Sequence, residues 1–292
     1  MSSAVQEQTS ITKQATCADW TSWVPPRTDP AIVMQVISKG FVDVERNFIR
    51  LMELNSAFTR QNMYLMCLDN ASVESFASLG IRCVPLDTLQ LSSEQDIWKT
   101  RVRVVSCLVV AGYDVIMSDA DALWLSDPME YMTLPPHRNS SVIASRGNYP
   151  HNLEKLWGAT ICMGFVLFRA TGAAMHIFLD KMERLVLKTG DDQISANRAA
   201  LELGISWNLD SDMRLRESTG VGKGTIAKLS GDGGPFEVVL LPHNIFTRFC
   251  TSTPISRKTV VAHCHSNKKQ SLGRRVSWMQ ETHLWSIDVS DP

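Results

Sequence analysis

Two aspartates separated by one residue, Asp119 and Asp121, directly follow an apolar run at residues 114–117. On extended backbone, side chains two residues apart lie on the same face, so we expect the two carboxylates to converge on one cation. Carboxylate oxygens suit hard divalent ions such as Mg²⁺ and Mn²⁺, which keep positions open for phosphate oxygens. The pair therefore predicts a metal site that receives a phosphorylated ligand. A second such pair, Asp210 and Asp212, lies in a polar stretch and is expected to be solvated.

The elements around this pair predict where it lies in the fold. Residues 94–111 have helical spacing and end at Gly112, and residues 114–117 form a short apolar strand. In open α/β sheets, ligands bind beyond the carboxyl ends of the strands, which is where the aspartates follow. Arg101 falls on the apolar row of the preceding helix, where a guanidinium needs a partner. It is either half of a structural ion pair or a ligand for an anion beyond the sheet edge.

Strand-like and helix-like segments alternate through the rest of the chain. Residues 31–37, 63–68 and 81–86 read as strands, and residues 43–58 and 71–79 read as helices. This alternation predicts a parallel sheet with helices on its faces. Later segments continue the pattern: strands at 141–144, 157–168, 236–241 and 259–265, helices at 173–187 and 194–203, and a polar hairpin or loop at 211–234. Residues 1–30 lack periodicity and predict a flexible arm before one domain at 31–292.

Composition narrows the classes of protein. The 292 residues are 44% hydrophobic and 20% charged, with a net charge of −1, which is typical of a soluble globular chain. The sequence has no cluster of basic residues that would form a nucleic-acid-binding face, so no nucleic-acid partner is expected. No apolar run reaches the length of a membrane span, and the first 30 residues lack the apolar core of a signal peptide.

Seven cysteines are scattered without a C-x-x-C pair, and four of them lie in apolar runs. Buried free cysteine behaves as a small hydrophobe, so we expect mostly reduced thiols. Two glycosylation sequons begin at Asn70 and Asn139, and they matter only if the chain enters a secretory lumen.

Four segments together resemble a known family: WKTRVRVV through AGYDVIMSDADALWLSDP at 98–128, WG to MGFVLFR at 157–169, GDDQ with NR at 190–198, and VVAH at 260–263. They resemble the nucleotide-diphospho-sugar transferases, GT-A glycosyltransferases similar to the family 77 xylosyl-, arabinosyl- and galactosyltransferases of plants and algae. The resemblance spans residues 31–285. It implies an α/β fold of the GT-A (Rossmann-like) type, a three-layer sandwich with a mostly parallel central sheet. It also implies transfer of a sugar from a nucleotide diphosphate, with retention and with Mn²⁺ or Mg²⁺.

The resemblance assigns roles to particular residues. Asp119, Asp121 and His263 would hold the metal, and Asp192 and Gln193 would be the catalytic residues of the sugar site. The donor would contact Arg101, Asp119, Ser38, Gly164 and Lys269. His265 shares a strand face with His263, but only counting from His263 places the small Ser266 and then Lys269 where related families hold the diphosphate. Two residues depart from the family pattern: Met163, which bears on the sugar, and Ser266, which bears on the loop over the diphosphate.

Two retaining routes remain open at this point. In the first, the acceptor hydroxyl attacks from the leaving-group face and the departing phosphate takes its proton. In the second, a carboxylate forms a covalent sugar intermediate, for which Asp192 is the candidate. The first is preferred, because an aspartate near a helix N-terminus is commonly a cap.

Other functions compete with the transferase as interpretations of this sequence. A sugar-nucleotide pyrophosphorylase needs a glycine- and arginine-rich loop after the first strand. Residues 38–41, at that position, read SKGF, which disfavours this function. The glycines at 220–224 only mimic a phosphate loop, because the glycine required earlier is Glu217. An inactive scaffold that binds nucleotide sugars or glycans is the alternative. The expected partners of the enzyme are a UDP-sugar and a glycan or glycoprotein acceptor. The expected compartment is the Golgi lumen if the chain is a truncated type II protein, and the cytoplasm if it is complete.

Overall fold

The computed structural model describes residues 15–86, 93–135, 137–208, 213–214, 219–231, 234–248, 250, 255–264 and 272–287. Its helices are α1 (Cys17–Thr21), α2 (Val42–Asn55), α3 (Asn70–Ser78), α4 (Glu94–Val110), α5 (Pro128–Met132), α6 (His151–Trp157), α7 (Ala173–Thr189), α8 (Asp192–Glu202) and α9 (Leu272–Glu281). Two short 3₁₀ turns, η1 (Lys39–Phe41) and η2 (Arg60–Asn62), precede α2 and β2. No helix in these ranges is long and apolar enough to cross a membrane.

Twelve described strands form two sheets. They are β1 (Ile32–Ile37), β2 (Met63–Cys67), β3 (Cys83–Pro85), β4 (Val115–Ser118), β5 (Ala122–Trp124), β6 (Val142–Gly147), β7 (Thr160–Phe168), β8 (Ile205–Trp207), β9 (Gly222–Gly231), β10 (Gly234–Leu240), β11 (Phe246–Thr247) and β12 (Val261–His263). The large sheet has the order β3-β2-β1-β4-β7-β6-β10-β9-β8, and the small sheet has the order β11-β12-β5. Strands β3, β2, β1 and β4 run parallel, whereas β7 is antiparallel to both β4 and β6. The predicted α/β class is confirmed, with the parallel part confined mainly to the N-terminal half.

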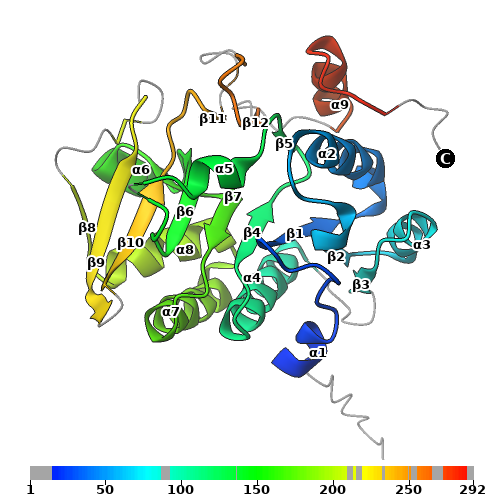
Figure 1. Cartoon of the computed structure of the whole chain (residues 1–292). Coiled ribbons are helices and arrows are strands. Elements are labelled where there is room, and N and C mark those ends of the chain that lie inside the picture. The colour runs from blue at the N-terminus through cyan, green and yellow to red at the C-terminus, as the bar shows by residue number, and fades with distance from the viewer. Residues whose placement is uncertain are drawn as a thin grey trace, which may run out of the picture.

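Helices and the small sheet cover the two faces of the large sheet, which makes three layers (Figure 1). Alternate residues of β1 show the division: Ile32 and Met34 belong to the core that α4, α7 and α8 complete, and Val33 and Ile37 belong to the core beneath α2 and α9. Both sets are buried, as expected for strands with a layer on each face.

Helix starts follow ordinary capping rules that position the later site. Ser93 caps α4 by accepting from the backbone N–H of Asp96, and Asp191 caps α8 by accepting from that of Ile194. Because Asp191 takes the capping role, its neighbour Asp192 is left to point elsewhere. Helix α4 therefore delivers Arg101, and α8 delivers Asp192, from one face of the sheet.

The expectation of mostly reduced cysteines is wrong. Disulfides join Cys17 to Cys107, Cys67 to Cys83, and Cys250 to Cys264, and Cys162 is free and buried. The pairing escaped sequence reasoning because the partners of the first two bonds meet only in the fold: Cys67 and Cys83 lie on the adjacent strands β2 and β3. Residues 15–30 also differ from a loose arm, since α1 buries Trp20 and is bonded to α4 through Cys17.

Candidate active site

The two aspartates follow β4 and lie in the short turn that leads from β4 to β5. The backbone N–H of Asp119 donates to the carbonyl of Gly164 at 2.8 Å, and that of Ala122 donates to the carbonyl of Asp119 at 2.9 Å. The carboxylates thus converge because the chain turns between two sheets, not because they share a face of one strand. The surroundings of the two carboxylates differ, since the Asp119 side chain is 38% exposed and that of Asp121 is 11% exposed.

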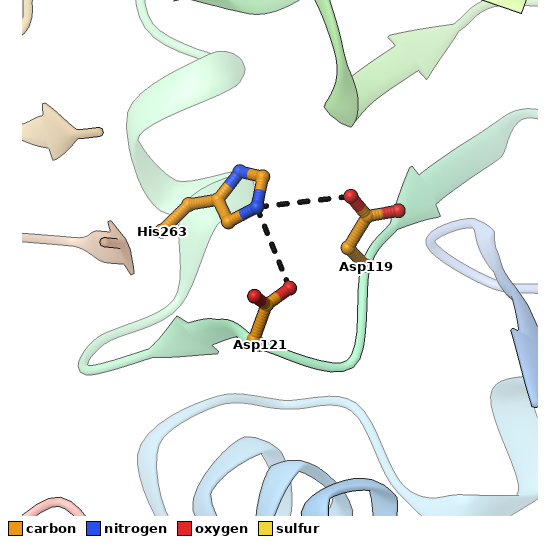
Figure 2. Close-up of side chains that lie close together, drawn as sticks. All are labelled: Asp119, Asp121 and His263. Atoms are coloured by element: carbon orange, nitrogen blue, oxygen red, sulfur yellow. Dashed lines mark ion pairs between the residues drawn. The ribbon is translucent and has the colours of Figure 1, made fainter. Parts of the chain in front are cut away.

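His263 reaches the aspartates through strand pairing. Strand β12 lies antiparallel to β5, and the register places His263 opposite Ala122, the residue after Asp121. Its Nε2 lies 3.4 Å from Oδ1 of Asp121 and 3.7 Å from Oδ2 of Asp119 (Figure 2). One ligand atom from each of the three residues lies within 4.8 Å of the others. The structure therefore brings together the three residues predicted to hold a metal.

Gly164 of β7 explains how these side chains fit. A Cβ at this position would collide with the imidazole of His263 and would lie 2.7 Å from Oδ2 of Asp119. The missing side chain is the space that the cluster occupies. Two carboxylates and one imidazole are donors that Mn²⁺ accepts, and the partly exposed Asp119 leaves the cluster open to an incoming oxygen ligand. The residues present therefore fit a divalent ion.

Arginine side chains contact the Asp119–Asp121–His263 cluster. Arg275 of α9 donates to Oδ2 of Asp121, and Nη1 of Arg248 lies 3.1 Å from Nδ1 of His263. Burial raises the pKa of the Asp121 carboxyl, but the charges of His263, Arg275 and Arg248 hold that pKa well below its usual range. Burial lowers the pKa of His263, but the charge of Asp121 and their hydrogen bond outweigh it and raise that pKa to about 9.

Arg101 links the cluster to Asp192. Its Nη2 donates to Oδ1 of Asp119 at 3.1 Å and to the carbonyl of Met163 at 3.0 Å, and its Nη1 lies 3.3 Å from Oδ2 of Asp192. The guanidinium is buried, so the partner that sequence reasoning demanded is a pair of carboxylates. Burial raises the pKa of Asp192 to about 6, against the lowering effect of the Arg101 charge.

A cavity of about 590 Å³ opens beside these groups. Six residues singled out from the sequence line it: Arg101, Asp119, Met163, Gly164, Asp192 and Gln193. Ser38, at the end of β1, is not in that lining, and Lys269 and His265 fall outside the described residues. The amide of Gln193 is occupied at both ends, since Nε2 donates to the carbonyl of Tyr149 and Oε1 accepts from the backbone of Met163.

Several lining residues carried no role in the sequence reasoning: Trp98, Asn148, Tyr149, His151, Asp191 and Arg248. Trp98 had a usable signal, because it precedes Arg101 by three positions on the same helix face, and the guanidinium lies 5.5 Å from its ring centroid. Arg248 follows β11, more than 120 residues along the chain from the aspartates, and only the pairing of the small sheet brings it near.

Comparisons with known proteins agree with this description. The family model for nucleotide-diphospho-sugar transferase matches residues 59–272. No curated protein matches the chain significantly. Among solved structures, the chain is similar to the bifunctional glycosyltransferase WbbM, at 14% identity and a TM-score of 0.44, over 60% of this chain and 38% of that one. It is also similar to the glycosyltransferase GlyE of Streptococcus pneumoniae TIGR4, at 15% identity and a TM-score of 0.41, over 57% of this chain and 42% of that one.

Mouse xyloside xylosyltransferase 1 is a further similar structure, at 11% identity and a TM-score of 0.36, over 59% of this chain and 81% of that one. The matched regions span about two fifths of the length of WbbM and GlyE. The family match covers well over half of the present chain. The chain belongs to the nucleotide-diphospho-sugar transferase family, and its fold is a mixed α/β fold with a large central sheet.

Proposed function

We propose that the chain is a metal-dependent, retaining glycosyltransferase that moves a pentose or galactose from a UDP-sugar to a hydroxyl of a glycan or glycoprotein. The observation that carries the proposal is the meeting of Asp119, Asp121 and His263 beside the Arg101–Asp192 pair. Asp119, Arg101 and Asp192 line one cavity. The diphosphate end of a donor needs a bound cation, which Asp119, Asp121 and His263 would hold. The sugar end needs a negative charge near the anomeric carbon, which Asp192 would supply.

The residues divide this chemistry between them. Asp119, Asp121 and His263 would hold Mn²⁺ or Mg²⁺, which when bound supplies Lewis-acid stabilisation of the diphosphate that leaves. Arg101 keeps Asp119 and Asp192 in place and adds positive charge at the base of the cavity. Asp192 faces that cavity with its charge available to the anomeric carbon as positive charge develops there.

The front-face route is the better supported of the two retaining routes. The Arg101 guanidinium lies 3.3 Å from Oδ2 of Asp192, and an ion pair of this kind makes a carboxylate a weaker nucleophile. In this arrangement Asp192 acts through its charge, and the departing phosphate takes the proton of the acceptor hydroxyl. Gln193 is a positioning residue, because both ends of its amide bind backbone groups.

The test is release of UDP from a panel of UDP-sugars, measured by mass spectrometry with Mn²⁺ and again with EDTA. We expect one sugar to be hydrolysed or transferred in a metal-dependent way. His263→Ala should weaken Mn²⁺ affinity and turnover at least roughly tenfold, the low end for loss of even an outer partner. Asp43→Asn, an exposed carboxylate on α2, is the matched control and should behave like the wild type.

The alternative is an inactive scaffold that binds nucleotide sugar. It is favoured by one observation: arginines already neutralise both aspartates, Arg101 at Asp119 and Arg275 at Asp121. Binding of UDP-sugar by calorimetry, with no metal-dependent release of UDP from any sugar in the panel, would select the scaffold.

The disulfides bear on the compartment, and we propose that the chain works in an oxidising lumen such as the Golgi. Six of seven cysteines are paired, which is typical of secretory compartments and rare in the cytosol. The two sequon asparagines, Asn70 and Asn139, are exposed and open to modification there.

A further inference from the structure

Part of the cavity wall has no role in the proposed donor chemistry. It comprises Asn148 and Tyr149, on the segment that joins β6 to α6, His151 at the start of α6, and Trp98 of α4. The Tyr149 residue is 40% exposed, whereas Asp192 of the same cavity is 6% exposed. The cavity therefore has a buried base at Asp192 and an exposed aromatic ring elsewhere in its wall.

Two side chains hold the main chain at Tyr149 by hydrogen bonds. Its carbonyl accepts from Oγ1 of Thr160 at 2.7 Å and from Nε2 of Gln193 at 2.6 Å. Thr160 is fully buried in β7. Since Gln193 follows Asp192 on α8, the helix that presents the buried carboxylate also holds the main chain from which the exposed ring projects.

Gly147 makes this anchor possible. A Cβ at Gly147 would lie 2.9 Å from Oγ1 of Thr160 and 3.1 Å from Nε2 of Gln193, the two donors to Tyr149. Three positions thus fix a backbone whose side chain adds little to the core. A binding site requires contact residues whose position is held by supporting residues. The held main chain of Tyr149, with its exposed side chain, meets that requirement.

The chemistry of this wall suits a carbohydrate ring. The ring of Tyr149 lies edge-on to that of His151, with centroids 5.7 Å apart and an interplanar angle of 85°. Aromatic faces pack against apolar surface, which in a pyranose is its C–H face, while the polar edges of tyrosine, histidine and asparagine bind hydroxyls.

We propose that Tyr149, with His151 and Trp98, forms the acceptor subsite and binds a pyranose ring of a glycan. The inference rests on the proposed function, since an acceptor has meaning only for a transferase. A sugar ring could also belong to the donor. The acceptor is favoured because the donor sugar must reach Asp192 at the buried base, whereas Tyr149 is exposed to a larger molecule arriving from solvent.

The first experiment measures binding without turnover. Methyl β-D-galactopyranoside and methyl β-D-xylopyranoside are the probes, observed by saturation-transfer NMR with UDP and Mg²⁺ present. We expect transfer to the ring protons of at least one probe, a loss of at least about fivefold in Tyr149→Ala, and retention in Tyr149→Phe. His176→Ala, at an exposed site on α7, is the control and should match the wild type. Absence of binding, or equal binding by wild type and Tyr149→Ala, overturns the subsite.

The second experiment separates acceptor from donor. In steady-state transfer, Tyr149→Ala should raise the acceptor KM about tenfold or more and change the donor KM less than about threefold. A rise in the donor KM instead would assign the ring to the donor sugar and overturn the acceptor assignment. Thr160→Val removes one anchor hydroxyl without touching the ligand, so it should raise the acceptor KM about threefold or more, and Thr160→Ser should restore it.

Failure of the two proposals is distinguishable. If the wild type releases no UDP from any donor but binds a pyranoside through Tyr149, the transferase proposal fails and the sugar site stands as a binding module. If UDP release is metal-dependent and pyranoside binding ignores Tyr149, the transferase proposal stands and the subsite fails. Melting temperatures near the wild-type value in Tyr149→Ala and Tyr149→Phe exclude unfolding as the cause of a loss.

Discussion

Arg101 and Asp192, both buried, lie 3.3 Å apart without satisfying each other completely. The Nε of Arg101 and the Oδ2 of Asp192 have no hydrogen-bond partner in the part of the chain that the structure describes. Buried polar atoms normally find partners, and their lack costs free energy. The pair therefore joins two charges from α4 and α8 while leaving one buried polar atom of each side chain without a hydrogen bond among the described residues.

Arg101→Lys is expected to affect stability and donor binding together. Lysine keeps the charge but cannot reach Asp119, Asp192 and the Met163 carbonyl at once, as the guanidinium does. Loss of one charged hydrogen bond should lower the free energy of unfolding by about 1.5–3 kcal/mol, and the donor KM should rise. Urea unfolding and donor kinetics measure the two effects. Arg103→Lys, at an exposed site paired with Glu183, is the control, and wild-type stability in Arg101→Lys would contradict the structural half of the prediction.

Asp121→Asn should abolish metal-dependent turnover and also destabilise the protein at neutral pH. Relief of repulsion between the two aspartates would suggest the opposite effect on stability. However, Asp121 lies against the buried His263 and the half-buried Arg275, so its removal leaves both cations without their counter-charge. Breaking such a pair typically costs about 3–5 kcal/mol. Thermal melts of the metal-free protein check this, and a higher melting temperature in Asp121→Asn would show that repulsion dominates.

Glu45 gives the fold a pH dependence of its own. The carboxyl is fully buried on α2 and meets the side-chain amide of Gln35 on β1, and burial raises its pKa well above the usual value. A raised carboxyl pKa favours the folded state at low pH, and this contribution is lost as pH rises through the folded-state pKa. Glu45→Gln should therefore gain stability relative to the wild type as pH rises.

Melting temperatures measured from pH 5 to 9 test this prediction. The difference between Glu45→Gln and wild type should grow in favour of the variant toward alkaline pH. The exposed Glu74→Gln on α3 is the control and should track the wild type throughout. A difference that is constant with pH would mean that Glu45 keeps its charge state on folding.

Thiol labelling tests the disulfides and the compartment. Protein from its native source, denatured without reductant, should take up one alkyl group, at Cys162, and seven after reduction. The same material should lose mass on treatment with an N-glycosidase if Asn70 or Asn139 is modified. Seven labels without reductant would place the chain in a reducing compartment and contradict the luminal proposal.

Elements with strong local signals were predicted well from the sequence. The expected helices at 94–111 and 173–187 correspond to α4 and α7, and the strand expected at 114–117 corresponds to β4 within one residue. Each depends on periodicity and end signals within a few residues of the chain. The antiparallel insertion of β7 between β4 and β6 had no such signal, because strand order is set by contacts far apart in sequence.

Part of the candidate site was predicted from the sequence, and part depends on contacts between distant segments. Asp119 and Asp121 were singled out because they follow a predicted apolar strand, and His263 was singled out by the family resemblance. Burial of Asp121 was missed, since it depends on Arg275 of the last described helix covering the turn. Tyr149 was missed because nothing in its own segment shows that Thr160 and Gln193 hold it.

The bond between Cys17 and Cys107 closes a covalent ring that contains β1, β2, β3 and the Arg101 turn of α4. A protease that cuts any single peptide bond between the two cysteines leaves both fragments attached to each other. Such a nicked chain would migrate as one species on a non-reducing gel and as two after reduction. The helix that carries Arg101 would thus remain tethered to the molecule after damage that would release it from an uncrosslinked chain.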